Sequence, residues 1–158
     1  MNDNIEKDLP SIDIVIDREG VWYYRGNEMV RKDIVSLFYQ KLERDQQGQY
    51  LVRNGDEAFY IKVEDVPYAV KSIELMKDET SGASYFKVLL SDDSLEDLDL
   101  ETLRIGKDNV LYCLVKGKTF EARFTRKAYY QLAEYIQYNS EKNIYYITLN
   151  NRLYEIQF

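Results

Sequence analysis

A helix-like stretch followed by a hairpin-like stretch occurs twice in this chain, in residues 31–63 and again in residues 126–158. An offset of 126 − 31 = 95 positions aligns the two windows without a gap. The alignment pairs Arg31 with Arg126, Lys32 with Lys127, Leu37 with Leu132, Tyr50 with Tyr145 and Ile61 with Ile156. Self-similarity of this kind indicates a duplicated supersecondary unit.

Composition narrows the class of protein further. A chain of 158 residues can bury about two-thirds of its unfolded surface in one compact body or in two packed halves. Aromatic residues make up 14% of the chain, which favours a strand-rich fold. The net charge of −7 argues against a general binder of phosphate backbones, so no nucleic-acid partner is predicted.

The chain has no His and a single Cys, Cys113. This inventory excludes an internal disulfide, the usual zinc sites, Cys/His nucleophile pairs and Ser-His-Asp triads. We therefore predict no catalytic residue, no metal site and no cofactor. No apolar run approaches the roughly 20 residues of a membrane span, and residues 1–10 do not resemble a secretory signal. A cytoplasmic, bacterial-type protein without a membrane partner is expected, and its oligomeric state stays open.

Periodicity predicts the individual elements. Helices are expected at residues 32–44 and directly after Thr125, a good N-cap. Hairpin turns are expected at Asn54-Gly55 and Asn150-Asn151. With these placements, the second turn lies one residue later than the ungapped offset requires. Strands are expected at residues 12–16, 21–25, 49–53, 57–63, 68–76, 84–90, 110–115, 119–124, 144–149 and 152–158.

These elements predict an α+β fold of two similar halves, each an antiparallel β-sheet packed on one helix in the order strand-strand-helix-strand-strand. The first half spans residues 1–77 with its leader, and the second spans residues 78–158. Six carboxylates fall within residues 91–101, and this acidic run is expected to be a solvated linker.

Three stretches carry a resemblance to a known family. They are the opening hairpin of residues 12–26 with Trp22 and Tyr24, the corner Glu64-Asp65-Val66-Pro67-Tyr68, and Glu121-Ala122-Arg123 with the following helix entry. Together they resemble family twelve eighty-five of the bacterial domain-of-unknown-function series. The resemblance implies a two-part fold with repeated motifs and suggests a ligand-sensing or signalling role, without an established activity.

The most suggestive polar group is Glu121, Arg123 and Arg126. Glu121 and Arg123 alternate onto one strand face, and Arg126 begins a helix, where an anion is favoured. Guanidinium groups could hold a phosphate or carboxylate, and the alternative is a structural salt-bridge cluster. Arg31 and Lys32 occupy the matching place in the first window, so a related pair of anion sites is conceivable.

Three functions stay open from sequence alone. The favoured one is a non-enzymatic ligand-binding or regulatory protein that recognises a small anionic ligand or a protein partner. Glu121, Arg123 and Arg126 would orient the ligand, with walls from Trp22, Tyr24, Glu64, Asp65 and Tyr68. The alternatives are a hydrolase that uses paired carboxylates in the cleft between the halves, and a module that binds a protein through exposed tyrosines.

Overall fold

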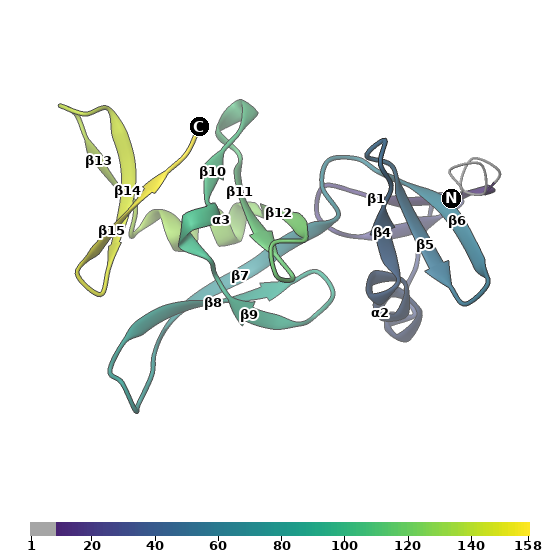
Figure 1. Cartoon of the computed structure of the whole chain (residues 1–158), viewed down its shortest axis with the longest axis horizontal. Helices are drawn as coiled ribbons and strands as arrows, with labels where there is room; N and C mark the ends of the chain where they lie inside the picture. Colours follow the sequence, from purple (N-terminus) through teal and green to yellow (C-terminus); the bar gives the residue numbers. More distant parts are fainter. Residues whose placement is uncertain (1–8) are drawn as a thin grey trace. The chain divides into compact units, whose positions relative to one another are not determined.

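The computed structural model describes residues 9–158, which form mostly β structure (Figure 1). Strands make up 49% and helices 15%, so the predicted α+β class is wrong. The chain divides into two compact units, the first ending at Pro67 and the second running from Tyr68 to Phe158. Residues 68–77, which the sequence analysis assigned to the first half, therefore belong to the second unit.

The first unit is built on a six-stranded mixed sheet. Its strands are β1 (Ser11–Ile16), β2 (Trp22–Tyr24), β3 (Asn27–Glu28), β4 (Leu42–Arg44), β5 (Tyr50–Asn54) and β6 (Glu57–Val63). They lie in the order β3-β2-β1-β6-β5-β4. The two central strands, β1 and β6, run parallel, and all the other pairs are antiparallel.

The second unit repeats this topology. Its first six strands are β7 (Tyr68–Lys77), β8 (Ser84–Leu90), β9 (Leu95–Asp97), β10 (Arg104–Ile105), β11 (Leu111–Val115) and β12 (Phe120–Phe124). Their order is β10-β11-β12-β7-β8-β9, with a parallel β7–β12 pair at the centre. In each sheet the chain winds from the centre to one edge, crosses over, and returns from the other edge to the centre. The prediction of purely antiparallel sheets is therefore wrong.

The crossover between the third and fourth strands differs between the units. In the first unit it contains helix α2 (Lys32–Gln40), and in the second it contains the short 3₁₀ helix η1 (Leu100–Thr102). The acidic run 91–101 is therefore not a solvated linker, since it supplies an edge strand and the buried Leu100. Within it, the Asp92 side chain is only 12% exposed and lies 2.7 Å from Lys116 Nζ.

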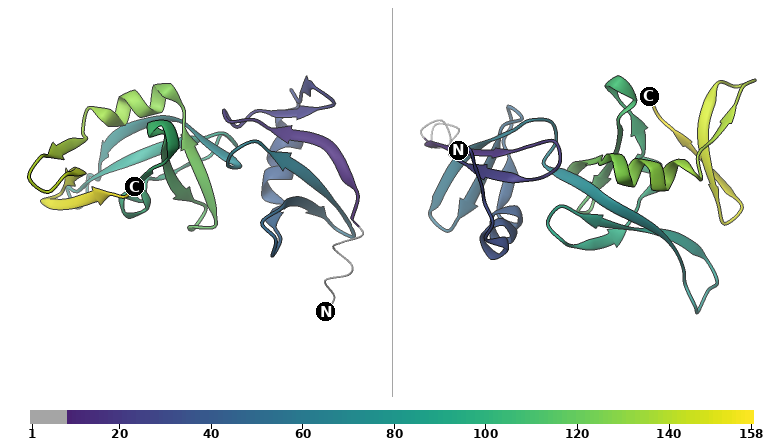
Figure 2. Two further views of the ribbon diagram at one scale, coloured as in Figure 1. Left: turned by 90° about the horizontal axis from the view of Figure 1, so that it is seen from above. Right: turned by 180° about the vertical axis from the view of Figure 1, so that it is seen from behind.

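Helix α3 (Arg126–Ala133) follows the second sheet and packs against β7 and β12 (Figure 2). Thr125 caps it as predicted, because its hydroxyl accepts a hydrogen bond from the Ala128 amide at 3.2 Å. The predicted order strand-strand-helix-strand-strand is found around α3, but the prediction of one sheet is wrong, because the strands before α3 and those after it lie in different sheets. A further 3₁₀ turn, η2 (Lys107–Asn109), joins β10 to β11.

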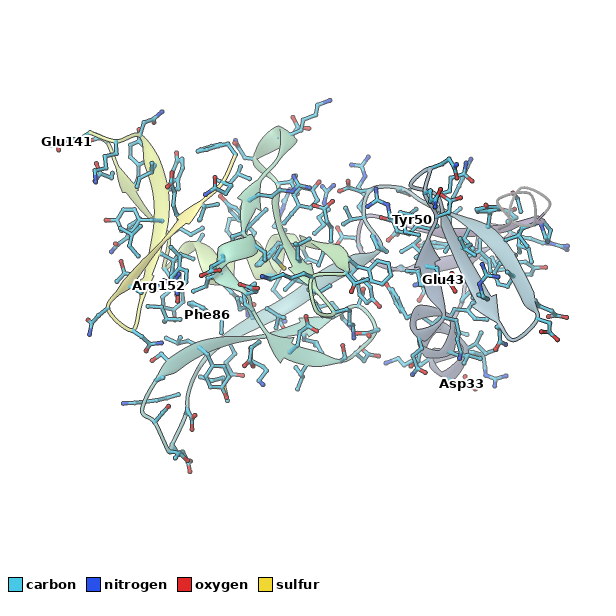
Figure 3. The ribbon with its side chains drawn as sticks, viewed as in Figure 1. Asp33, Glu43, Tyr50, Phe86, Glu141 and Arg152 are labelled. Carbon is cyan, nitrogen blue, oxygen red and sulfur yellow. The ribbon has the colours of Figure 1, made fainter. Side chains whose placement is uncertain are left out.

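A third sheet, antiparallel and three-stranded, follows α3. It consists of β13 (Gln137–Asn139), β14 (Ile144–Leu149) and β15 (Arg152–Ile156). Contacts that join this part of the chain to the rest of the second unit include a ring pair of Phe86 and an ion pair of Arg152 (Figure 3). The Phe86 ring lies 5.1 Å from that of Tyr135, and the Arg152 guanidinium lies 2.6 Å from the Glu101 carboxylate.

The predicted repeat is confirmed for the two hairpins. Tyr50 pairs with Ile61 as Tyr145 pairs with Ile156, and every other pair of β5–β6 recurs in β14–β15 at the same offset. The first turn is Gly55-Asp56 rather than the predicted Asn54-Gly55, because Asn54 already pairs with Glu57. The corrected turn matches Asn150-Asn151 without a gap.

Helix α2 is shorter than predicted and buries a different residue. It ends at Gln40, and Leu42 lies in β4 instead of extending the helix to residue 44. Tyr39 is 3% exposed, and its hydroxyl donates to the Pro67 carbonyl at 2.9 Å, whereas Leu37 is 38% exposed. In residues 9–158 neither helix has the length and apolar character needed to cross a membrane.

Candidate functional site

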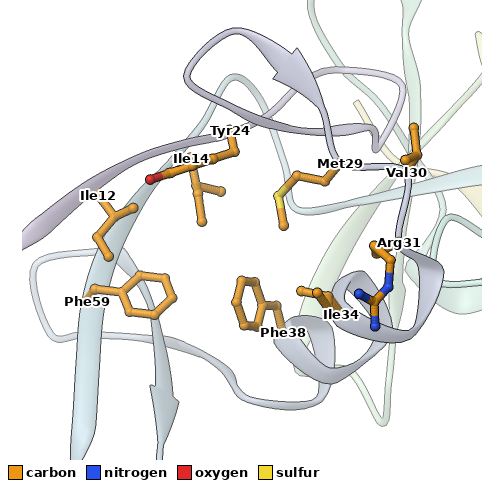
Figure 4. Close-up of a pocket in the computed structure, with 9 residues that line it drawn as sticks. All are labelled: Ile12, Ile14, Tyr24, Met29, Val30, Arg31, Ile34, Phe38 and Phe59. Atoms are coloured by element: carbon orange, nitrogen blue, oxygen red, sulfur yellow. The ribbon is translucent and has the colours of Figure 1, made fainter.

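A pocket of about 390 Å³ lies in the first unit, between α2 and the sheet (Figure 4). Its walls come from β1, β2, β6, α2 and the segment that leads into α2. The lining residues are Ile12, Ile14, Tyr24, Met29, Val30, Arg31, Ile34, Phe38 and Phe59. This size and this apolar lining are those of a small-molecule site.

Local periodicity explains how the walls form. Ile12 and Ile14 are two apart in a strand and therefore point to the same face. Ile34 and Phe38 are four apart in α2 and share one side of the helix. The Phe38 ring meets the Phe59 ring of β6 edge-on at 5.6 Å between centroids, which closes one wall.

The rim of the pocket leaves apolar surface in contact with solvent. Val30 is 76% exposed, Tyr24 42% and Ile12 36%. Single exposed apolar residues are ordinary, but three of them in the lining of one apolar pocket make that pocket a candidate binding site.

Among residues 9–158, Arg31 is the one charged residue in the lining of this pocket. Its Nε and Nη2 atoms donate to the two Asp33 carboxylate oxygens at 3.0 and 2.6 Å. These hydrogen bonds hold the pKa of the Asp33 carboxyl below its ordinary value and raise the pKa of Arg31. Both side chains are about two-thirds exposed, at 68% and 65%, so water screens the pair and it stabilises the fold little.

Trp22 connects the pocket to the core. Its ring lies 6.1 Å from that of Phe38, which lines the pocket, and 4.9 Å from that of Tyr39. Trp22 is 1% exposed and is not among the residues that line the pocket. Its indole Nε1 is buried and has no hydrogen-bond partner among the described residues.

A second pocket, of about 350 Å³, lies in the second unit. It is lined by Ile105, Asn109, Leu111, Tyr129, Ala133, Ile136, Gln137, Tyr138, Tyr145 and Phe158. Tyr129 and Ala133 stand at the same offset of 95 from Ile34 and Phe38, so equivalent helix positions line both pockets. Arg126, the counterpart of Arg31, is exposed and does not line the second pocket.

The predicted polar group is only partly assembled. Glu121 accepts hydrogen bonds from Arg104 of β10, at 2.9 Å from Nε and 2.5 Å from Nη2. The Arg104 guanidinium also lies 4.2 Å from the centre of the Tyr112 ring. Arg123 is half-buried in β12, where it pairs with Tyr112 and with Ala69 of β7. The salt bridge of Glu121 therefore joins two strands, not a strand to the helix.

The other residues predicted to form ligand walls differ in their exposure to solvent. Glu64 and Asp65 are exposed at the end of the first unit. Tyr68 is 3% exposed at the start of the second, with its ring 5.7 Å from that of Phe120. Of the residues predicted to bind a ligand, Tyr24 lines the first pocket.

Sequence reasoning missed most of the lining of the first pocket. Periodicity places Phe38 and Phe59 on the inward faces of their elements, but it does not separate a core side chain from one that borders a cavity. One usable signal was present. Met29 and Val30 form an apolar pair in the connection that follows Gly26, where a solvent-exposed segment would ordinarily be polar.

Comparison with known proteins finds one family match and two similar solved structures. Residues 6–66 match the family described as "Domain of unknown function (DUF1285), N-terminal domain". A DUF1285 family protein from Silicibacter pomeroyi DSS-3 superimposes with a TM-score of 0.75 at 19% identity, covering 94% of this chain and 81% of that one. Another from Shewanella baltica OS155 gives a TM-score of 0.60 at 19% identity, covering 77% of this chain and 90% of that one. No curated protein matches the chain.

Fold and pocket define a mostly β protein of two units with a repeated sheet topology and an apolar pocket in the first unit. The predicted resemblance to this family is confirmed over residues 6–66, which match the DUF1285 N-terminal domain, and the fold is similar to that of two DUF1285 family proteins. Among residues 9–158 no group of three or more Cys, Asp or Glu side chains is placed to hold a metal ion.

Proposed function

We propose that this protein is a non-enzymatic binding protein whose first unit holds a small, largely apolar ligand between α2 and the sheet. The observation that carries the proposal is the open 390 Å³ pocket, in which eight of the nine lining residues are apolar or aromatic. A regulatory role in the cytoplasm, as the sequence predicts, would follow if the bound ligand changed how the protein meets its partners.

The lining of the pockets favours binding over hydrolysis. A carboxylate hydrolase needs two carboxyl groups within roughly 5 to 10 Å of each other at the substrate. Neither the first nor the second pocket has an Asp or Glu side chain in its lining, within the described part of the chain.

The single tryptophan provides the assay. Trp22 touches Phe38, so a ligand that fills the pocket should change its emission. We expect octan-1-ol, a neutral probe, to change the emission in a saturable way with one site per chain. A ligand this small should bind with a dissociation constant of about 10 µM to 1 mM, given the usual free energy per atom.

A matched pair of variants tests the location. Ile12→Asp places a charge at the rim of the pocket and should weaken octan-1-ol binding at least about tenfold, because the charge would have to lose water. Leu153→Asp makes the same change at an exposed position of β15 and should leave binding unchanged. If octan-1-ol does not saturate, or if both variants bind it equally well, the proposal is wrong.

A further inference from the structure

We infer that the ligand of the first pocket is an amphipathic monocarboxylate, with its chain among the apolar walls and its carboxylate at Arg31. The inference rests on the proposed function and adds the chemical class of the ligand and the residue that selects it.

The volume of the first pocket limits the length of the ligand's hydrocarbon chain. If each non-hydrogen atom takes about 30 Å³, the space of a water molecule in the liquid, 390 Å³ holds roughly a dozen atoms. This corresponds to a straight chain of about eight to ten carbons with its head group. Longer acids would leave their ends in solvent, and shorter acids would leave part of the walls wet.

The charge sets the head group. Arg31 is the only charged residue that the described part of the chain contributes to the lining, and its planar guanidinium matches a carboxylate in shape. Arg31 also precedes α2 directly, at the positive end of the helix dipole. One cation at one end of an apolar pocket complements a molecule with one anionic end.

The ion pair with Asp33 does not block this role. Asp33 occupies Nε and Nη2 of Arg31, while a guanidinium has five N–H donors in all. A ligand carboxylate can therefore bind at Nη1 beside Asp33, or replace Asp33 at little cost because the pair is exposed. Asp33 then acts as a competitor that lowers the affinity for anions.

The second pocket provides an internal contrast. The residues described in its lining include no Lys, Arg, Asp or Glu, and the equivalent arginine, Arg126, lies outside it. Selection for a carboxylate is therefore expected in the first unit alone, and Arg126 is the natural control for Arg31.

Calorimetric titration with octanoate and octan-1-ol at pH 8 tests the inference. The wild-type chain should bind octanoate at least about fivefold more tightly than octan-1-ol, because a hydrogen bond to a charged group strengthens binding. Arg31→Gln should weaken octanoate binding at least about fivefold more than it weakens octan-1-ol binding, so that the preference is lost. Asp33→Asn should strengthen octanoate binding, and Arg126→Gln should alter neither ligand.

The chain-length series adds a second readout. From hexanoate to decanoate the affinity should rise about two- to fourfold per methylene and then level off, as expected for chain burial in a pocket of fixed size. Equal binding of octanoate and octan-1-ol, or an unchanged preference in Arg31→Gln, would overturn the carboxylate inference while the apolar site stands. Failure of both ligands to bind would remove the proposed function itself.

Discussion

The two helix-and-hairpin windows share a backbone plan but not a site. Both hairpins have the same register, and equivalent positions of α2 and α3 line a pocket. At these positions α2 has Ile34 and Phe38, whereas α3 has Tyr129 and Ala133. Among the described residues the first pocket has one cation in its lining, whereas the second has four aromatic residues, two amide side chains and no charged residue. A few side chains, not the repeated backbone, therefore decide what each pocket can bind.

The largest expected effect is on the rate at which Cys113 reacts with a thiol reagent. This rate reports on the second unit, and the emission of Trp22 reports on the first. Cys113 lies in β11, and burial raises the pKa of its thiol to about 12. At pH 8 a thiol-specific disulfide reagent should label it at least about 1000-fold more slowly than in the unfolded chain, because labelling requires opening of the second unit. Trp22 emission reports the first unit alone.

The urea dependence of these two signals separates two cases. Coincident transitions would mean that the units unfold together. Labelling of Cys113 that begins well before the Trp22 transition would show that the second unit opens independently. Rapid labelling in the absence of urea would contradict the buried position of Cys113.

An intermediate effect is expected at the cores of the two hairpins. Val52 and Ile147 occupy equivalent positions, and both are 0% exposed. Ile147→Ala should lower the free energy of unfolding by about 2 to 5 kcal/mol, and the milder control Ile147→Val by about 0.5 to 1.5 kcal/mol. Val52→Ala removes less volume and should cost less than Ile147→Ala. Urea unfolding followed by circular dichroism measures all three, and a cost below that of the control for either alanine variant would show that its hairpin is not a packed core.

The smallest effect should come from the helix starts. Thr125→Ala removes the side-chain cap of α3 and should cost about 1 kcal/mol, or about 4 to 8 °C in Tm for a domain of this size. Arg31 is the N-cap residue of α2, and its side chain makes no capping hydrogen bond. Arg31→Ala should therefore shift the melting temperature less than Thr125→Ala. Equal shifts in thermal denaturation would mean that the Thr125 cap contributes nothing specific.

Local signals predicted the antiparallel hairpins well. The β14–β15 hairpin was placed correctly because alternating apolar residues flank Asn150 and Asn151, which both adopt the positive φ that a type I′ turn requires. The helix cap at Thr125 was found for a similar reason, since its signal lies within three residues.

Long-range pairing could not be predicted in this way. Ile16 lies beside Val63, and Phe124 beside Val70, in the parallel pairs at the centres of the sheets. No local sequence signal in either strand of such a pair identifies its partner. The prediction of antiparallel sheets therefore rested on the hairpins alone. The pocket was missed because whether Phe38 borders a cavity depends on how far α2 lies from the sheet, which no spacing in the sequence encodes.

The central parallel pairs also affect how the chain can be made. As the chain leaves the ribosome, β1 emerges early, but its partner β6 appears only after every other strand of the first sheet. Until Val63 is available, the inner edge of β1 stays unpaired and could join a foreign strand. β7 faces the same delay before β12 arrives. During synthesis of each unit, the inner edge of its first central strand therefore stays unpaired until the last strand of the same sheet has been made.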